Sequence, residues 1–173
     1  MKNEEFSDLY QQEMEAGEQF TGDDFVDDCA IESDLETYFP DSYVPGSRER
    51  MLLFRELDHL QSDDELKAYR QRLIDRFGPV PKEGEELMHV VTLRRLGKRL
   101  GAEKIMLKTG SMQMQFVSNV NSPFYKSQMF SRVINYVTTH VRECALKENN
   151  NKRYLRIKDV TSVEQAVELL RKI

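Results

Sequence analysis

Three charged residues near the middle of the chain have a spacing that suits a binding surface. Arg72, Asp75 and Arg76 stand at positions i, i+3 and i+4, so a helix would bring them onto one exposed face. Such a triplet at the end of a rigid helix suits docking onto a partner, and it provides no catalytic site. The simpler interpretation is an ion pair within one helix on a solvated face, worth a few tenths of a kcal/mol. The residues alone favour that simpler interpretation.

The element that must position this triplet is a helix that ends at Gly78. Its apolar residues recur at helical spacing and predict one buried stripe, formed by Leu66, Tyr69, Leu73 and Phe77. Ser62 is expected to cap the start, with Glu65 completing a capping box. Gly78 stops the helix, and Pro79 and Pro81 prevent its continuation.

Two basic clusters offer a second kind of binding chemistry. The first lies near the end of the helix expected over 81–100 and comprises Arg94, Arg95, Lys98 and Arg99. It suits a phosphate or an acidic protein, although compensation of the helix dipole is the simpler interpretation. The second lies on a strand expected over 153–158 and comprises Lys152, Arg153, Arg156 and Lys158, with Tyr125 and Tyr154 as stacking rings. A solvated edge strand defended by charge is its simpler interpretation.

Other chemistry finds little support in the residues. No glycine-rich phosphate loop is present, and the three histidines are too far apart for metal-ligand spacing. Paired acids such as Asp63-Asp64 fall in linker or helix-capping contexts. Cys29 and Cys144 form no disulfide framework, which indicates a reducing, intracellular setting. We therefore expect no enzyme, no cofactor and no metal in this chain.

The charge distribution divides the chain into an acidic leader and a basic body. Residues 1–41 hold 14 acids and one base, whereas residues 42–173 hold 16 acids and 24 bases. We expect residues 1–28 to be an acidic linker with one marginal helix over 3–17, and residues 29–173 to be a single domain. No stretch approaches the roughly 20 apolar residues that a membrane span needs.

Hydrophobic periodicity predicts an α+β fold, with a three-helix half followed by a small antiparallel sheet packed by helices. The expected strands are 29–36, 104–108, 112–117 and 153–158, and 147–152 is expected to be a loop. The expected helices are 47–60, capped by Ser47, then 62–77, 81–100, a long helix 123–141 with Ile134 and Val141 inward, and a final helix after Thr161 or Ser162.

Three segments carry a resemblance to a known family. They are 38–44 (Tyr-Phe-Pro-Asp-Ser-Tyr-Val), 50–55 (Arg-Met-Leu-Leu-Phe-Arg) and 73–81 (Leu-Ile-Asp-Arg-Phe-Gly-Pro-Val-Pro). In this order and spacing, the chain resembles the C-terminal (TRCF) domain of bacterial transcription-repair coupling factor. The resemblance is strong over residues 29–108, loose over 109–173 and absent over 1–28, which would be the connection from a preceding motor domain.

The resemblance implies a regulatory role without enzymatic activity in this fragment. The parent protein would be a bacterial, cytoplasmic, ATP-driven DNA translocase that removes stalled RNA polymerase and recruits the excision-repair A subunit. The C-terminal domain would dock on the N-terminal module and mask the A-subunit surface, with Asp75 and Arg76 matching the family's contact positions. Arg72 stands where the family often has an acid, and Phe54 where it often has Tyr. The alternative is a stand-alone nucleic-acid-binding module that uses helix 81–100 and strand 153–158.

Overall fold

The computed structural model describes residue 26, residues 28–119 and residues 121–173. The expected linker and its helix over 3–17 lie almost entirely outside the described residues. Among the described residues, no helix is both long and apolar enough to cross a bilayer.

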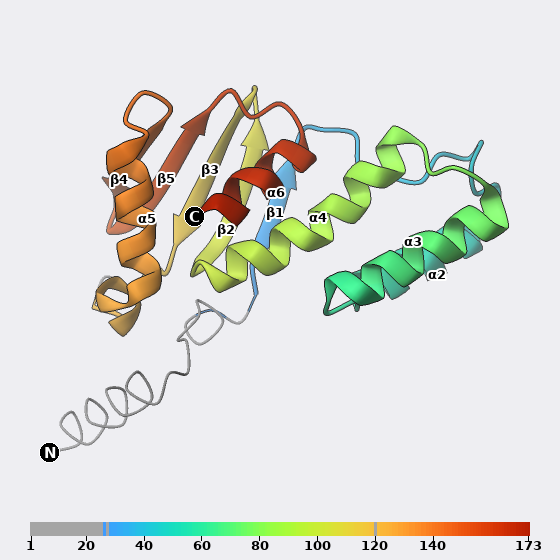
Figure 1. Ribbon diagram of the computed structural model, residues 1–173, viewed down its shortest axis with the longest axis horizontal. Coiled ribbons are helices and arrows are strands. Elements are labelled where there is room, and N and C mark those ends of the chain that lie inside the picture. The colour runs from blue at the N-terminus through green and yellow to red at the C-terminus, as the bar shows by residue number, and fades with distance from the viewer. Residues whose placement is uncertain (1–25, 27, 120) are drawn as a thin grey trace, which may run out of the picture.

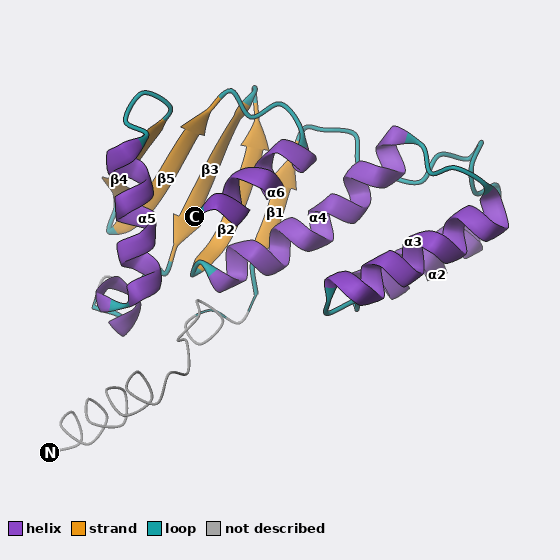
Figure 2. Ribbon diagram, in the orientation of Figure 1, coloured by secondary structure: helices purple, strands orange, loops and turns teal. Residues whose placement is uncertain are grey.

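The fold is α+β, as the periodicity predicts (Figures 1 and 2). Three helices follow the first strand: α2 (Ser47–Asp58), α3 (Asp63–Phe77) and α4 (Lys82–Arg99). The strands are β1 (Ala30–Ser33), β2 (Ala102–Lys108), β3 (Ser111–Phe116), β4 (Cys144–Asn149) and β5 (Lys152–Lys158). The remaining helices are η2 (Pro123–Lys126), α5 (Gln128–Thr139) and α6 (Val163–Lys172).

The strands form one sheet in the order β1-β2-β3-β5-β4. Pairings among β2, β3, β5 and β4 are antiparallel, as predicted, but β1 runs parallel to β2. The parallel strand is possible because the three helices between β1 and β2 return the chain to the same end of the sheet. The sheet is therefore mixed, with one edge strand added from the N-terminal side.

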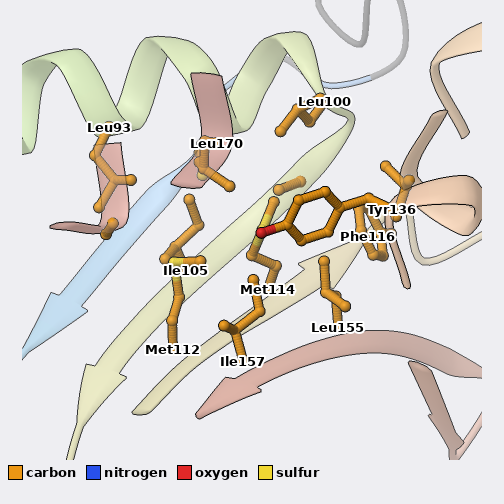
Figure 3. Close-up of a cluster of buried hydrophobic side chains, with 14 of the residues drawn as sticks. Leu93, Leu100, Ile105, Met112, Met114, Phe116, Tyr136, Leu155, Ile157 and Leu170 are labelled. Atoms are coloured by element: carbon orange, nitrogen blue, oxygen red, sulfur yellow. The ribbon is translucent and has the colours of Figure 1, made fainter. Parts of the chain in front are cut away.

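Helices α4, α5 and α6 lie over one face of the sheet (Figure 2). Alternate residues of the strands point into this layer, where they are buried: Ile105, Leu107, Met112, Met114, Phe116, Leu155 and Ile157. Figure 3 shows Leu93 of α4 and Leu170 of α6 above these strand residues. This apolar layer is the larger core of the molecule.

A second apolar cluster lies away from the sheet, between α2, α3 and the first half of α4. Its buried members are Phe39, Val44, Leu53, Leu57, Tyr69, Leu73, Leu87, Met88 and Val91. Helix α4 therefore supplies Leu87 and Val91 to this cluster and Leu93 to the core on the sheet, which its C-cap residue Leu100 also joins. Figure 1 shows α4 running from the α2–α3 hairpin to the sheet.

A buried carboxylate ties α6 to α4. Glu86 is only 7% exposed, and its carboxylate oxygens accept hydrogen bonds from the backbone N–H of Val163 at 2.6 Å and of Glu164 at 3.4 Å. These N–H groups belong to the first turn of α6 and have no partner within the helix. The side chain of Ser162 accepts the N–H of Gln165, so the predicted serine cap is confirmed.

The prediction that residues 147–152 form a loop is wrong. Most of this polar stretch belongs to β4 and β5, which pair from Cys144↔Ile157 to Asn149↔Lys152. The turn is just Asn150 and Asn151, both in the left-handed region with φ of 51° and 62°. Such a two-residue turn matches the twist of a hairpin, and asparagine tolerates it better than most residues. Strand β5 is consequently internal, and β4 is the edge strand.

The predicted long helix over 123–141 is also wrong in part. It is divided at Ser127, whose side chain accepts the N–H of Phe130 and caps α5 after the short 3₁₀ helix η2. Val141 lies beyond α5 and is 71% exposed, and Ile134 is exposed as well.

The prediction that Ser47 caps the first helix is also wrong. The N-cap residue of α2 is Gly46, which makes no side-chain hydrogen bond to the helix.

Two glycines allow close packing between α4 and the sheet core. A Cβ on Gly97 would lie 2.6 Å from Ile105 Cδ1 and 2.9 Å from Cys29 Sγ. Gly101 has φ of 78°, and a Cβ there would overlap the ring of Phe124. Gly97 therefore permits close packing, and Gly101 provides the left-handed backbone just after the end of α4.

We expect Gly101→Ala to destabilise the fold by about 3 kcal/mol, because the positive φ and the overlap with the Phe124 ring both oppose a side chain. Gly110→Ala is the matched control, since Gly110 also has a positive φ of 72° but nothing within 4 Å of the added Cβ. It should cost only about 1 kcal/mol. Urea denaturation of both variants measures the difference, and equal losses would contradict the packing role of Gly101.

Candidate docking surface

The α2–α3 hairpin packs beside α4 and lies away from the sheet (Figure 1). Helix α3 is fixed at its start, where Ser62 Oγ accepts the N–H of Glu65 at 3.1 Å. The Glu65 carboxylate returns to the N–H of Gln61 at 2.8 Å, one residue earlier than in a standard capping box. At the other end, the Tyr43 hydroxyl donates to the carbonyl of Gly78 at 2.7 Å. Both ends of α3 are thus held by specific hydrogen bonds.

The predicted apolar stripe of α3 faces the second cluster. Tyr69 and Leu73 are buried, and Leu66 and Phe77 are partly buried against the same cluster. The Tyr69 hydroxyl donates to the carbonyl of Leu53 at 2.7 Å, so the polar end of this side chain is satisfied inside the core. Burial raises the pKa of Tyr69 well above its usual value, and the group stays protonated.

The triplet of Arg72, Asp75 and Arg76 is exposed at the surface of α3, but its ion pairs are not those expected within one helix. Arg72 contacts the Glu56 carboxylate at 2.5 Å, and Arg76 pairs with Glu49, so both cations reach across to α2. Asp75 accepts a hydrogen bond from Gln71 at 3.0 Å. The two guanidinium groups also lie over aromatic rings of α3, Arg72 over Tyr69 and Arg76 over Phe77.

The surface around the triplet includes an apolar residue that the sequence analysis did not single out. Leu52 is 55% exposed, and it shares a face of α2 with Glu49 and Glu56 by its i−3 and i+4 spacing. We define the docking surface as Glu49, Leu52, Glu56, Arg72, Asp75 and Arg76. The available signal was the excess of apolar residues in α2, since 51–54 are all apolar and one helix face cannot bury all of them.

A second group of exposed apolar side chains lies on another side of α2. Met51 is 59% exposed and Phe54 is 50% exposed. Together with Tyr38, they line an open groove of about 570 Å³. Arg50 and Arg55 border it. The side chain of Arg50 donates to the Val44 carbonyl at 2.7 Å, so this arginine orders the aromatic segment that precedes α2.

Two arginines of the first basic cluster are committed to contacts within the fold. Arg94 contacts the side chain of Asp58 at 2.6 Å, and Arg95 contacts that of Asp63 at 2.7 Å. Each also donates to a backbone carbonyl at the α2–α3 turn, Arg94 to Asp58 and Arg95 to Gln61. These contacts hold the hairpin against α4. Lys98 and Arg99 are the other two members of the first basic cluster.

The second basic cluster is divided between the two faces of the sheet. Arg153 points to the helical side, where its guanidinium lies 4.3 Å from the centre of the Tyr125 ring. Tyr154, Arg156 and Lys158 alternate with the buried Leu155 and Ile157, so they lie on the opposite face. Because α4 covers the helical side, the surface predicted from helix 81–100 together with strand 153–158 is not continuous.

The cysteines and histidines lie in structural settings. Burial raises the pKa of the Cys29 thiol to about 12, and burial together with Glu143 raises the pKa of the Cys144 thiol. Both thiols are therefore poor nucleophiles at neutral pH. His59 and His140 each place Nδ1 near a backbone carbonyl one turn earlier. Within the described residues, no cluster of three potential metal ligands is present.

These features define an α+β domain whose distinctive surface is a charged, rigidly capped helical hairpin. The family model of the TRCF domain matches residues 33–127, and the chain therefore belongs to the TRCF domain family. The resemblance to the C-terminal domain of transcription-repair coupling factor is confirmed. This family places the chain in the context of transcription-coupled DNA repair.

Relatives and a solved structure agree with this assignment. The transcription-repair-coupling factor of Rickettsia conorii is 25% identical over 137 residues, which is 79% of this chain and 12% of the relative. That of Escherichia coli K12 is 27% identical over 75 residues, 43% of this chain and 6% of the relative. The chain thus spans about an eighth of the length of the Rickettsia relative.

The fold similarity extends over most of the chain. A crystal structure of the C-terminal domain of transcription-repair coupling factor superposes with a TM-score of 0.64. It is 15% identical in sequence, and the match covers 84% of this chain and 91% of the other. The similar fold reaches well past residue 108, where the recognisable sequence motifs end.

We expect Arg95→Met to destabilise the fold by about 1 kcal/mol at neutral pH, because the clamp to Asp63 and to the Gln61 carbonyl is lost. The hydrogen bond from Arg95 holds the pKa of Asp63 below its usual value in the folded state. The stability from this interaction is present above the unfolded pKa of about 4 and is lost as pH falls through the folded value.

The difference in stability between the variant and the wild type should therefore narrow at acidic pH, and only the part from the hydrogen bond to the Gln61 carbonyl should remain. Urea denaturation at neutral pH and near pH 2 measures this narrowing. Asp64→Asn is the matched control, because Asp64 lies beside Asp63 at the same helix N-terminus and is exposed. A difference between Arg95→Met and wild type that persists undiminished near pH 2 would contradict the ionic clamp.

Proposed function

We propose that this chain is the regulatory, autoinhibitory C-terminal domain of a transcription-repair coupling factor. It docks on the N-terminal module of the full-length protein through the docking surface on α2 and α3. In the docked state it masks the surface that binds the excision-repair A subunit. The parent protein would be an ATP-dependent DNA translocase that acts on stalled RNA polymerase, and this domain would contribute regulation to it.

The exposed, preordered charges on the α2–α3 hairpin carry this proposal. Arg72 and Arg76 have side chains that are 59% and 58% exposed, although each already contacts a carboxylate of α2. The caps of α3 and the pairing with α2 hold them in place before any partner arrives. Little ordering entropy is then lost on binding, which favours association.

The apolar residue among these charges supports the same use. Leu52 exposes more than half of its surface beside Glu49 and Glu56, where water contact brings no stabilisation. A partner that covers Leu52 would gain from apolar burial, and the surrounding charges would set its orientation. An apolar centre with a polar rim is a common arrangement at protein interfaces.

The pairing with α2 also explains how the surface accommodates Arg72. The family position often holds an acid, and the substitution reverses the charge contributed by α3. In this chain the Glu56 carboxylate lies 2.5 Å from the Arg72 guanidinium. A carboxylate is therefore still available at this site, supplied by the neighbouring helix. The docking partner would meet alternating charges and no excess of one sign.

The remaining assignments follow from the proposal. Residues 1–28 would form the acidic linker from the motor domain, and residues 29–173 would form the regulatory unit. The setting would be the bacterial cytoplasm, where the two buried cysteines stay reduced. One observation favours the alternative, a nucleic-acid-binding module. The open face of the sheet carries an excess of basic residues on β4 and β5.

We expect the double change Asp75→Ala and Arg76→Ala to weaken docking onto the N-terminal module about tenfold or more. Charged groups that are desolvated at an interface leave unpaired partners when they are removed. The stability of the isolated domain should fall by about 1 kcal/mol or less, because exposed ion pairs contribute little. Calorimetric titration with the isolated N-terminal module measures the affinity, and urea denaturation measures the stability.

The matched control is Glu168→Ala with Lys172→Ala, which removes one acid and one base four residues apart on exposed α6. This control should leave docking unchanged. In the full-length protein, the α3 variant should raise both A-subunit binding and basal ATP turnover, whereas the control should alter neither. Normal docking by the α3 variant with a lowered melting temperature would show that these residues are structural and that the interface lies elsewhere.

A further inference from the structure

Among the residues that the structure describes, no helix covers one face of the sheet. Helices α4, α5 and α6 all lie on the other face (Figure 2). The strand residues that alternate with the core residues are partly or fully exposed, and none of them is buried. We call this the outer face, and its members on the three strands β3, β5 and β4 are Ser111, Gln113, Gln115, Ala145, Lys147, Asn149, Lys152, Tyr154, Arg156 and Lys158.

Over β3, β5 and β4, the charge on the outer face has one sign. Lys147, Lys152, Arg156 and Lys158 lie on β4 and β5, and within the described part of the chain none of them forms an ion pair. No acid stands on the outer face of β3, β5 or β4. A merely solvated surface usually mixes acids and bases, because like charges held close together repel one another.

The nearby carboxylates lie at the margins of the outer face. Glu32 on the edge strand β1 contacts Lys104 at 2.9 Å and Lys108 at 3.4 Å, so its carboxylate balances one of the two lysine charges of β2. Glu103 lies at the irregular start of β2 and accepts hydrogen bonds from Ser118 and, at 3.4 Å, from the side-chain amide of Gln115 on the outer face. The unbalanced positive charge is therefore concentrated over β5 and β4.

Strand register brings polar and aromatic groups into rows between these cations. In one row, Tyr154 stands directly between Gln115 of β3 and Lys147 of β4. In the next row, Arg156 stands between Gln113 and Ala145. Adjacent strands are about 4.8 Å apart, so the ring of Tyr154 is flanked on both sides by groups that can bond phosphates or base edges.

We propose that the outer face of the sheet binds single-stranded nucleic acid, with Lys147, Lys152, Arg156 and Lys158 contacting phosphates and Tyr154 stacking on a base. This surface lies on the opposite side of the sheet from α4 and is separate from the docking surface. The inference therefore goes beyond the proposed function and does not depend on it.

Two observations favour a nucleic acid over an acidic protein segment. A polyanion of either kind would satisfy the four cations, but the partly exposed Tyr154 at the centre of the rows offers a flat ring to a base. Glutamines on the neighbouring strand add donors and acceptors for base edges. Open sheets that present aromatic rings between basic residues suit unpaired strands, because every base has a face that can stack. In a duplex the bases are already stacked on each other.

Fluorescence anisotropy with the whole chain and labelled oligonucleotides of about 12 nucleotides tests the proposal. Oligothymidylate and oligouridylate distinguish DNA from RNA, and a duplex of the same length and a polyglutamate peptide serve as competing ligands. With four phosphate contacts, affinity for the single strand should fall about 50-fold between about 50 mM and 200 mM salt. The duplex and the peptide should bind more weakly than the single strand.

The variants separate charge from stacking. Arg156→Gln with Lys158→Gln should reduce the salt effect to about sevenfold, because two phosphate contacts remain. Tyr154→Ala should weaken binding about fivefold or more, and Tyr154→Phe should retain it, because stacking requires only the ring. Lys98→Gln with Arg99→Gln removes the same charge from α4 and should leave binding close to wild type. Urea denaturation checks that each variant is folded.

Several results would overturn the proposal. The first is the absence of binding by the wild-type chain to either oligonucleotide at the lower salt concentration. Equal weakening by the α4 control pair would show that only net charge matters. Unchanged binding by a folded Tyr154→Ala variant, or equally tight binding of duplex or polyglutamate, would show that no base is stacked and that the face is a general acceptor of acidic partners.

Discussion

Helix α4 must satisfy two hydrophobic clusters at once, and most of the other features of this fold follow from that constraint. It buries Leu87 and Val91 against the helical hairpin, and it buries Leu93 and its C-cap residue Leu100 against the sheet. Each cluster would lose buried apolar side chains if this helix were absent. The glycine at position 97 lets the second half of α4 approach the sheet, since Ile105 and Cys29 occupy the space that a side chain would need.

Charged residues reinforce the same helix from both sides. Arg94 and Arg95 fasten the α2–α3 turn, Glu85 contacts Arg70 of α3 at 2.6 Å, and Glu86 caps α6. Single exposed ion pairs contribute little to stability, but Arg94, Arg95 and Glu86 also bond to backbone groups of the neighbouring elements. The polar residues of α4 therefore determine where the neighbouring elements sit, and the charges of α3 face outward on a fixed framework.

The sequence predicted the elements whose periodicity is strong and local. The stripe on α3, the Ser62 cap and the Gly78 stop depend on neighbouring residues, and all three are present. Strand β4 was missed because it is an exposed edge with one buried residue, Cys144, and so lacks a clear alternation. The parallel pairing of β1 could not be deduced, since it joins segments more than 70 residues apart.

The partners of the charged residues were equally hidden from the sequence. The pairs Arg72–Glu56 and Arg95–Asp63 link residues 16 and 32 positions apart, so spacing along one helix gives no sign of them. A simple helical wheel places these arginines on surface faces and leaves them free. Tertiary structure shows which cations are engaged, and which, such as Arg156 and Lys158, stand together on an open face.

The unbroken course of α4 between its two clusters has a mechanical consequence. A helix of 18 residues is about 27 Å long, and α4 contains no proline that would let it hinge. A tilt of about 10° at the sheet end would carry the hairpin end through about 5 Å, more than the reach of a hydrogen bond. The continuous helix therefore couples the orientation of the hairpin to that of the sheet.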